Sequence, residues 1–112
     1  MELNLSHEEG YVLAATSGPI DDTAKGLFRE YLYPLVGQGG TKVVLDLSRS
    51  NFITSTGIGQ LVSMVAHANT NGSRIILAAC TPFVAVVLDR CKLNRFLEMA
   101  DGVPEAVRLL LG

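Results

Sequence analysis

Three consecutive hydroxyl side chains, Thr54, Ser55 and Thr56, stand immediately before an apolar series with helical spacing. A hydroxyl at the start of a helix accepts a hydrogen bond from a free backbone N–H group of the first turn. Such a cap needs only one hydroxyl, and the others would lie at the positive end of the helix dipole, where a phosphate is stabilised. Phosphorylation adds roughly −1.5 to −2 charges at one point. The triplet therefore supports two interpretations, a helix cap and a regulatory phosphorylation site.

Gly57 and Gly59 follow the triplet and open the same helix. A glycine pair between a strand and a helix is the setting of a dinucleotide-binding fingerprint, which also requires a third glycine and a tight turn. Here Val62 stands at the third position, and a connection of several residues separates the pair from the strand. We therefore interpret the glycines as small residues that permit close backbone packing.

The remaining reactive side chains form no catalytic or metal-binding pattern. His7 and His67 are the only histidines, and we interpret each as a lone surface residue. Cys80 and Cys91 form no CxxC motif and have no nearby histidine, so we expect two small apolar core residues rather than a zinc site. No P-loop, HExxH or GxSxG motif occurs. We expect no enzymatic activity, no cofactor and no metal.

Length, composition and charge narrow the class of protein. The chain has 112 residues, of which 48% are hydrophobic and 18% charged, so one domain with a buried core is expected. The net charge is −2, and the nine Lys and Arg residues are scattered, which argues against nucleic acid as a partner. Apolar runs reach six residues, whereas a membrane span needs about twenty. We expect a cytoplasmic protein without membrane insertion.

The periodicity of apolar side chains predicts the elements that position these residues. Strands are expected at 2–7, 11–16, 42–47 and 74–79, with a short edge strand within 93–99. Helices are expected to begin at Asp21 or Asp22, at the hydroxyl triplet, at 81–82 and at 104–105. Pro34 lacks an N–H group and clashes one turn back, so it predicts a kink or an end of the first helix near Tyr33.

This order predicts an α/β fold in a single domain over residues 1–112. The first two strands are close enough in sequence to form a hairpin. The later strands alternate with helices, which is typical of a mainly parallel sheet with helices packed against it. The expected sheet is therefore mixed, with an antiparallel hairpin at one edge.

Two segments together resemble the signature of the STAS domain, and more narrowly that of bacterial anti-sigma factor antagonists, which typically read "vvlDls…fiDSsGlg.L". They are Val43-Val44-Leu45-Asp46-Leu47-Ser48 and Phe52-Ile53-Thr54-Ser55-Thr56-Gly57-Ile58-Gly59-Gln60-Leu61. Further matches fall at 18–24, at 72–77 and at 82–93, so the resemblance covers nearly the whole chain. It implies the same mixed sheet with helices packed against it.

The resemblance also implies a function. An unphosphorylated antagonist binds an anti-sigma factor that is itself a serine kinase, which frees the sigma factor. The kinase then uses ATP to phosphorylate the antagonist, which is released, and a PP2C-type phosphatase resets it. By position the acceptor would be Ser55, with Thr56 and Thr54 as alternatives. The expected partner-binding residues are Asp21, Thr54, Ser55, Thr56, Gly57, Gln60 and Ser63.

The sequence departs from the family pattern at two positions. Thr54 stands where the family usually has Asp, so the acceptor would lack a neighbouring carboxylate that orients the hydroxyl or aids recognition by the kinase. Lys92 stands where the family has Gly, so we expect a different C-cap on the third helix. Asp21 matches the acidic residue that lies near the acceptor in the family, although it serves equally well as a helix cap.

Two other functions remain open from the sequence. The first is a STAS scaffold or accessory subunit of a transport or sensory complex without a phosphorylation switch, which the Thr54 departure favours. The second is a small enzyme or ligand carrier that uses the carboxyl ends of the strands, which rests on analogy of fold alone. The oligomeric state is open between a monomer and a weak dimer.

Overall fold

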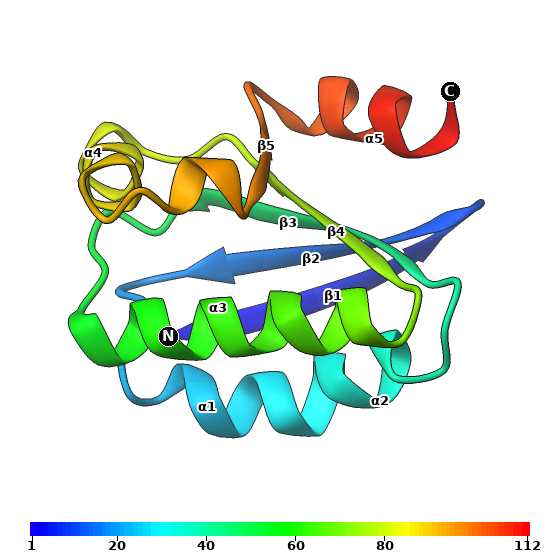
Figure 1. Cartoon of the computed structure of the whole chain (residues 1–112), viewed down its shortest axis with the longest axis horizontal. Coiled ribbons are helices and arrows are strands. Elements are labelled where there is room, and N and C mark those ends of the chain that lie inside the picture. Colours follow the sequence, from blue (N-terminus) through cyan, green and yellow to red (C-terminus); the bar gives the residue numbers. More distant parts are fainter.

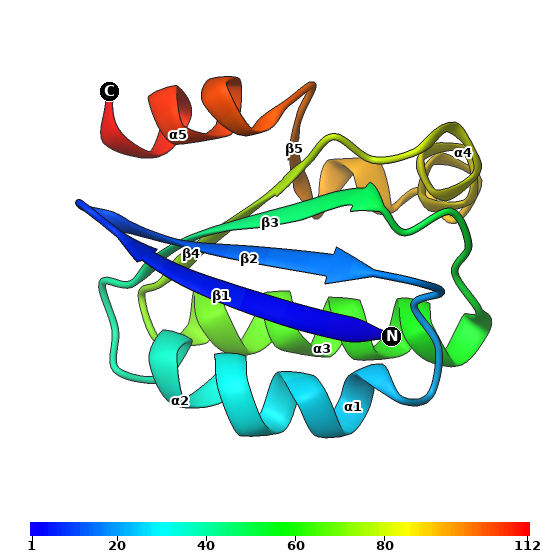
Figure 2. The same cartoon turned by 180° about the vertical axis from the view of Figure 1, so that it is seen from behind.

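The computed structural model describes residues 1–112, which form one sheet with helices on both of its faces (Figures 1 and 2). The strands are β1 (Glu2–Glu8), β2 (Tyr11–Ser17), β3 (Lys42–Arg49), β4 (Arg74–Ala78) and β5 (Glu98–Ala100). The helical elements are α1 (Ala24–Leu27), η1 (Phe28–Leu32), α2 (Tyr33–Val36), α3 (Ser55–Thr70), α4 (Pro82–Arg90), η2 (Leu93–Arg95) and α5 (Val103–Leu111).

The sheet has the strand order β1-β2-β3-β4-β5. β1 and β2 pair antiparallel from Glu2 opposite Ser17 to Glu8 opposite Tyr11, which confirms the predicted hairpin. Every later neighbour pair is parallel. β3 is the central strand, and β4 is buried at all but its first residue, as its continuous apolar sequence predicts. The structure thus confirms the predicted mixed sheet and the α/β class.

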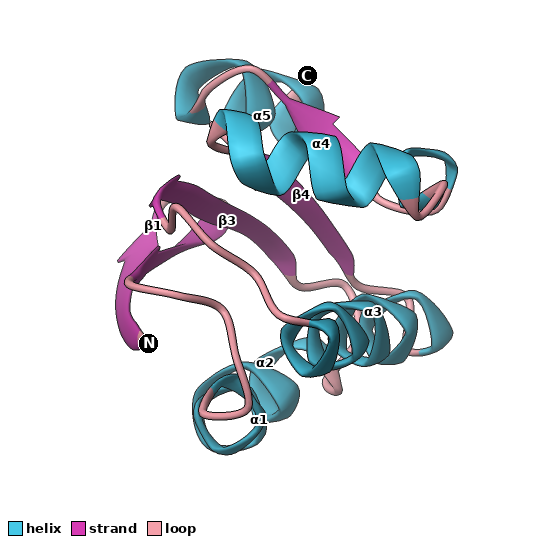
Figure 3. Ribbon diagram, turned by 90° about the vertical axis from the view of Figure 1, so that its left-hand side faces the viewer, coloured by secondary structure: helices cyan, strands magenta, loops and turns pink.

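The two faces of the sheet are covered unequally (Figure 3). Alternate residues of β2 (Val12, Ala14 and Thr16) are buried, because a strand turns every second side chain to the same face. On that face, α1, η1, α2 and α3 enclose the larger apolar core. On the opposite face, α5 packs Ala106 and Leu110 onto β3 and β4 in a smaller core, with Tyr11 and Leu13 of β2 partly buried against it. No helix of the structure has both the length and the apolar composition needed to span a membrane.

The first helix does not end at Pro34. It passes through the π-helical turn η1, in which the Tyr33 N–H donates to the Phe28 carbonyl, and continues as α2 with Pro34 in its first turn. In a regular α-helix the Pro34 ring would clash with the carbonyl of Glu30. A wider turn immediately before the proline changes this geometry and allows the chain to remain helical.

The end of α4 also differs from the expectation. No alternative C-cap replaces the missing glycine, because Lys92 itself adopts the left-handed conformation with φ 59° and ψ 27°. The lysine therefore occupies a backbone conformation that costs an ordinary residue about 1–2 kcal/mol. The 3₁₀ turn η2 and the short edge strand β5 follow, the latter within one residue of the predicted segment.

The cysteine prediction is wrong for Cys91, which lies exposed at the C-cap of α4, and Cys80 is only partly buried. Helical spacing places Cys91 near the Val84–Leu88 stripe, but α4 ends at Arg90 and Cys91 lies outside the core. His7 is exposed as predicted, whereas His67 is partly buried, with its ring stacked on Tyr33 at a centroid distance of 4.7 Å.

The two thiols are expected to react at very different rates. Burial favours the neutral thiol and raises the pKa of Cys80 to about 11, so about one molecule in a thousand carries the thiolate at pH 8. Iodoacetamide at pH 8 should therefore add one carboxamidomethyl group, at Cys91, and a second only near pH 11 or on unfolding. Intact-mass kinetics on the wild type and on Cys91→Ser test this expectation. Equal rates for both thiols at pH 8 would contradict it.

Candidate functional site

Two loops meet at the carboxyl ends of β2 and β3. The Ile20 N–H donates to the Phe52 carbonyl at 2.9 Å, and the Thr54 N–H donates to the Ile20 carbonyl at 3.0 Å. Ile20 and Ile53 thereby form an isolated parallel bridge, and both side chains are buried. Residues 18–23 are thus fixed against the segment that leads into α3.

Gly57 lies against this bridge in the first turn of α3. A Cβ atom added at Gly57 would stand 2.0 Å from the Ile20 carbonyl oxygen and 2.6 Å from its carbon. The predicted close backbone packing is therefore confirmed for Gly57. It is wrong for Gly59, which is exposed and has no atom within 4 Å of an added Cβ.

The three hydroxyls divide their roles at the start of α3. Thr54 has the extended conformation of an N-cap residue, and its Oγ1 accepts a hydrogen bond from the Gly57 N–H at 3.1 Å. Ser55 and Thr56 are the first two residues of the helix, and both side chains are exposed. One hydroxyl caps the helix, and two remain at its positive end.

Removing the cap is expected to destabilise the fold moderately. Thr54→Ala should lower the free energy of unfolding by about 1 kcal/mol, because the Gly57 N–H loses its acceptor. Thr54→Asp should leave it within about 0.5 kcal/mol of the wild type, since Asp caps at least as well as Thr. Urea unfolding followed by circular dichroism measures both. Identical midpoints for Thr54→Ala and the wild type would contradict the assigned cap.

Asp21 lies beside Gly57 through its backbone, because an added Gly57 Cβ would stand 3.1 Å from the Asp21 nitrogen. Its carboxylate accepts hydrogen bonds from the backbone N–H of Thr23, at 3.0 Å, and from the Thr23 hydroxyl. These bonds favour the ionised form and hold the pKa of Asp21 below its usual range. Asp21 and Asp22 were both predicted as caps of the first helix. Of the two, Asp21 is the residue whose side chain accepts hydrogen bonds just before α1. It brings one fixed negative charge to the neighbourhood of α3.

The outward side of α3 continues from the hydroxyls. Thr56, Gln60 and Ser63 follow one another at helical spacing, so they share one side of the helix. Ser63 is exposed and Gln60 is partly buried. The predicted site residues are therefore brought together around the first turns of α3. We call Ser55, Thr56, Gln60 and Ser63 the α3 surface; none of its side chains is charged.

A buried hydroxyl pair, which the sequence did not reveal, holds the loop before α3. Thr16 and Ser50 are almost fully buried, and their side-chain oxygens lie 2.7 Å apart. The Thr81 hydroxyl donates to the Ser50 carbonyl at 2.8 Å. β2, the 50–54 loop and the start of α4 are thereby tied together. Serine and threonine at these positions resemble ordinary loop residues in sequence, so no signal identified them.

A stacked pair of aromatic rings joins the same loop to α4. Phe52 and Phe83 have ring centroids 5.0 Å apart, with 23° between their planes, although both side chains are nearly half exposed. The sequence offered a partial signal, because Phe83 lies off the Val84–Leu88 stripe that packs α4 into the core.

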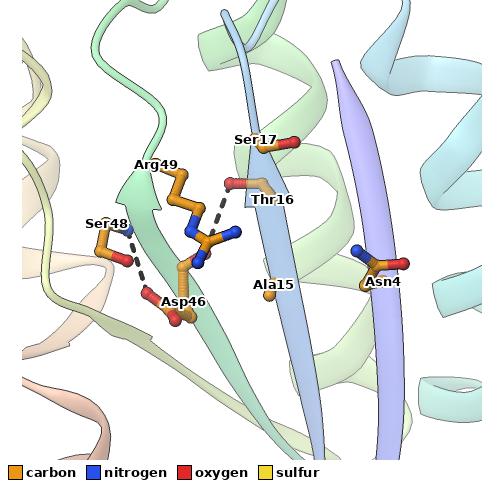
Figure 4. A pocket seen from close by; sticks show the side chains of 7 residues that line it. All are labelled: Asn4, Ala15, Thr16, Ser17, Asp46, Ser48 and Arg49. Atoms are coloured by element: carbon orange, nitrogen blue, oxygen red, sulfur yellow. Dashed lines mark hydrogen bonds between the residues drawn. The ribbon is translucent and has the colours of Figure 1, made fainter.

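The largest concavity lies away from the α3 surface, on the sheet face opposite α3 (Figure 4). It measures about 280 Å³ and is mostly polar, and the Ser48 N–H donates to the Asp46 carboxylate within it at 3.0 Å. The Arg49 guanidinium extends over it. None of the predicted site residues contributes to the lining, which consists of Asn4, Ala15, Thr16, Ser17, Asp46, Ser48 and Arg49. The structure has no cluster of three or more His, Cys, Asp or Glu side chains placed to hold a metal ion.

Comparison of the sequence and the fold with known proteins identifies a matching family and several similar structures. The family model of the STAS domain matches residues 2–106. A Thermotoga maritima protein described as a candidate anti-sigma factor antagonist superposes with a TM-score of 0.86 at 20% identity, over 96% of this chain and 93% of that one. The phosphorylated form of the Bacillus cell fate determinant SpoIIAA superposes with a TM-score of 0.73 at 20% identity, over 97% of this chain and 99% of that one.

One similar structure belongs to a different class of protein. The murine anion transporter Slc26a9 matches over 90% of this chain, with a TM-score of 0.76 and 16% identity, although the match covers only 18% of the transporter. Likenesses at this level of identity show a shared fold.

Proposed function

Because the chain belongs to the STAS domain family, we propose that it is a cytoplasmic anti-sigma factor antagonist, which binds an anti-sigma factor with serine kinase activity and is itself not an enzyme. The observation that carries this proposal is the start of α3. Thr54 caps the helix, which leaves Ser55 exposed at its first position. A kinase can reach this hydroxyl without unfolding any element.

The α3 surface is suited to a phosphorylation switch because it is uncharged. A partner that packs on Ser55, Thr56, Gln60 and Ser63 buries no charged side chain of this surface. A phosphate on Ser55 would add roughly −1.5 to −2 charges there. The helix dipole would stabilise that phosphate in the free protein, whereas a docked partner would have to bury it. Phosphorylation should therefore release the partner, and a PP2C-type phosphatase would restore binding.

Thr54 is compatible with this function. Its hydroxyl makes the capping bond to the Gly57 N–H, which the Asp typical of the family could also make. The substitution removes a negative charge next to Ser55 and leaves the start of α3 intact. The Thr54 hydroxyl is partly buried and engaged as the cap, whereas Ser55 and Thr56 are exposed. We therefore favour Ser55 as the acceptor, and Thr56 before Thr54 as the alternative.

The direct test uses the serine-kinase anti-sigma factors of the source organism, purified and mixed one at a time with this chain. One of them should bind the chain in the presence of ADP. With ATP it should transfer one phosphate, mapped to Ser55 by peptide mass spectrometry, and the complex should dissociate. Ser55→Ala should bind equally well and remain bound in ATP. Failure of every such kinase to bind would overturn the proposal.

The transporter likeness supports a second candidate, an accessory subunit of a transport or sensory complex that does not switch. The matched segment of Slc26a9 shows that this fold also occurs within a transporter chain. On this alternative, the chain would form a complex whose stability does not change with ATP or with Ser55→Ala. A complex with a permease or its ATPase, unchanged by both, would favour it over the antagonist.

A further inference from the structure

An exposed apolar patch adjoins the loop that leads to Ser55. The rings of Phe52 and Phe83 stack at 5.0 Å while remaining 49% and 45% exposed. Val86, one turn further along α4, is 50% exposed. Single apolar side chains on a surface are common, but two adjoining aromatic rings with a third apolar group nearby form a contiguous patch. We call Phe52, Phe83 and Val86 the aromatic patch.

The aromatic patch is held in place by the same contacts that position Ser55. The Phe52 carbonyl accepts from Ile20, whose own carbonyl accepts from Thr54, and Thr54 caps α3. On the other side, the Thr81 hydroxyl ties the start of α4 to Ser50. Both rings are therefore presented in a fixed arrangement, and a partner would lose little conformational entropy in ordering them.

Positive charge lies beside the aromatic patch. Arg90 follows Phe83 and Val86 at helical spacing, so the three share the outward face of α4. Lys92 and Arg95 are exposed just beyond the helix, against one exposed carboxylate in the same segment, Asp89. The salt bridge found in the structure joins Arg74 to Glu98, so none of these three cations is paired. The C-terminal side of the patch is therefore cationic.

We propose that the aromatic patch is a second docking site for the same kinase. On this proposal, Phe52 and Phe83 enter an apolar pocket on the kinase surface, and carboxylates of the kinase lie beside Arg90. This inference rests on the proposed function and extends the interface from the α3 surface across the 50–54 loop to α4. Aromatic side chains in well-packed pockets contribute most of the energy in many interfaces. The unpaired cations match an acidic rim and would speed association with it.

Site-specific photo-crosslinking in the source cells tests where the kinase sits. A benzophenone amino acid would replace Phe83, or Gln60 on the α3 surface, or Leu109 as a control. Leu109 is 45% exposed, like Phe83, but its carbonyl accepts a hydrogen bond from Arg74 at the start of β4, whereas α4 follows the other end of that strand. Irradiation should link the same kinase, identified by mass spectrometry, at positions 60 and 83 and not at position 109.

The outcomes separate this inference from the proposed function. A kinase linked at position 60 but not at 83 would overturn the second docking site and leave the antagonist function intact. No kinase linked at either position would overturn both. A second copy of this chain as the sole product at position 83 would also overturn the inference, because the patch would then be a self-association surface.

Affinity measurements with the purified kinase provide an independent test. Phe83→Ala should weaken binding about tenfold or more, whereas Leu109→Ala should leave the dissociation constant unchanged. Arg90→Glu should slow association and weaken its dependence on added salt. Lys42→Glu is the matched control for the change of charge. Lys42 is exposed at the start of β3, whereas the 50–54 loop that carries Phe52 follows the end of that strand. A cooperative thermal unfolding transition would show that each variant is folded. If Phe83→Ala is folded and binds the kinase with the affinity of the wild type, the inference is overturned.

Discussion

Gly57→Ala is expected to lower the free energy of unfolding by about 3 kcal/mol or more, which is a large part of the roughly 5–15 kcal/mol that stabilises a domain. The new methyl group would stand 2.0 Å from the Ile20 carbonyl oxygen. Both sides of that contact are backbone, so no side chain can rotate away. The helix would have to move from the bridge, which breaks the hydrogen bond from Thr54 to Ile20.

Gly59→Ala is the matched control for this prediction. Gly59 lies two residues further along α3, is exposed, and has open space where a Cβ would be added. Alanine there should raise the free energy of unfolding by about 0.5–1 kcal/mol, because glycine is unfavourable inside a helix. Urea titration of both variants gives the two values. A Gly57→Ala midpoint equal to or above that of Gly59→Ala would contradict the close packing at Ile20.

Ser55→Glu is expected to stabilise the free protein and to weaken its complex with the kinase. A carboxylate in the first turn of α3 interacts favourably with the helix dipole, by about 0.3–1 kcal/mol. In the complex the same charge would be buried without a partner, at a cost of about 3 kcal/mol, which corresponds to roughly a hundredfold loss of affinity. A variant that is more stable but binds the kinase more weakly has a blocked interface, whereas a damaged fold would lower both stability and affinity.

Asn69→Glu is the control for charge alone, because Asn69 is exposed near the other end of the same helix. Calorimetric titration with the kinase should give the wild-type affinity for Asn69→Glu and for Ser55→Ala. Equal affinity of Ser55→Glu and the wild type would show that Ser55 lies outside the interface, and would remove the physical basis of the switch.

The sequence predicted those elements in which the apolar side chains follow one simple pattern. The hairpin, the central strand β3 and the strand β4, which is apolar after Arg74, all follow from alternation or from an unbroken apolar run. The arrangement at the start of α3 was predicted for a related reason, since three hydroxyls before a helical stripe required one cap and left two side chains free. The assignment of the cap to Thr54 needed the backbone, because each hydroxyl could have filled that role.

Some of the missed features are local exceptions to backbone rules, and others depend on contacts between distant segments. Pro34 predicted a kink or an end of its helix, whereas the helix continues past it through a π turn. Lys92 adopts a glycine conformation that the sequence disfavours. The Thr16–Ser50 hydrogen bond and the Phe52–Phe83 stack join residues more than thirty positions apart, and no spacing pattern reports such pairs.

Phosphopeptide mass spectrometry of the protein purified from its own cells, resting and stressed, tests the proposed switch most directly. We predict a single phosphate on Ser55 whose occupancy changes with the condition, and a co-purifying kinase only with the unphosphorylated form. Ser55 without phosphate under every condition, or a partner that co-purifies equally with both forms, would contradict the switch and favour a constitutive accessory subunit.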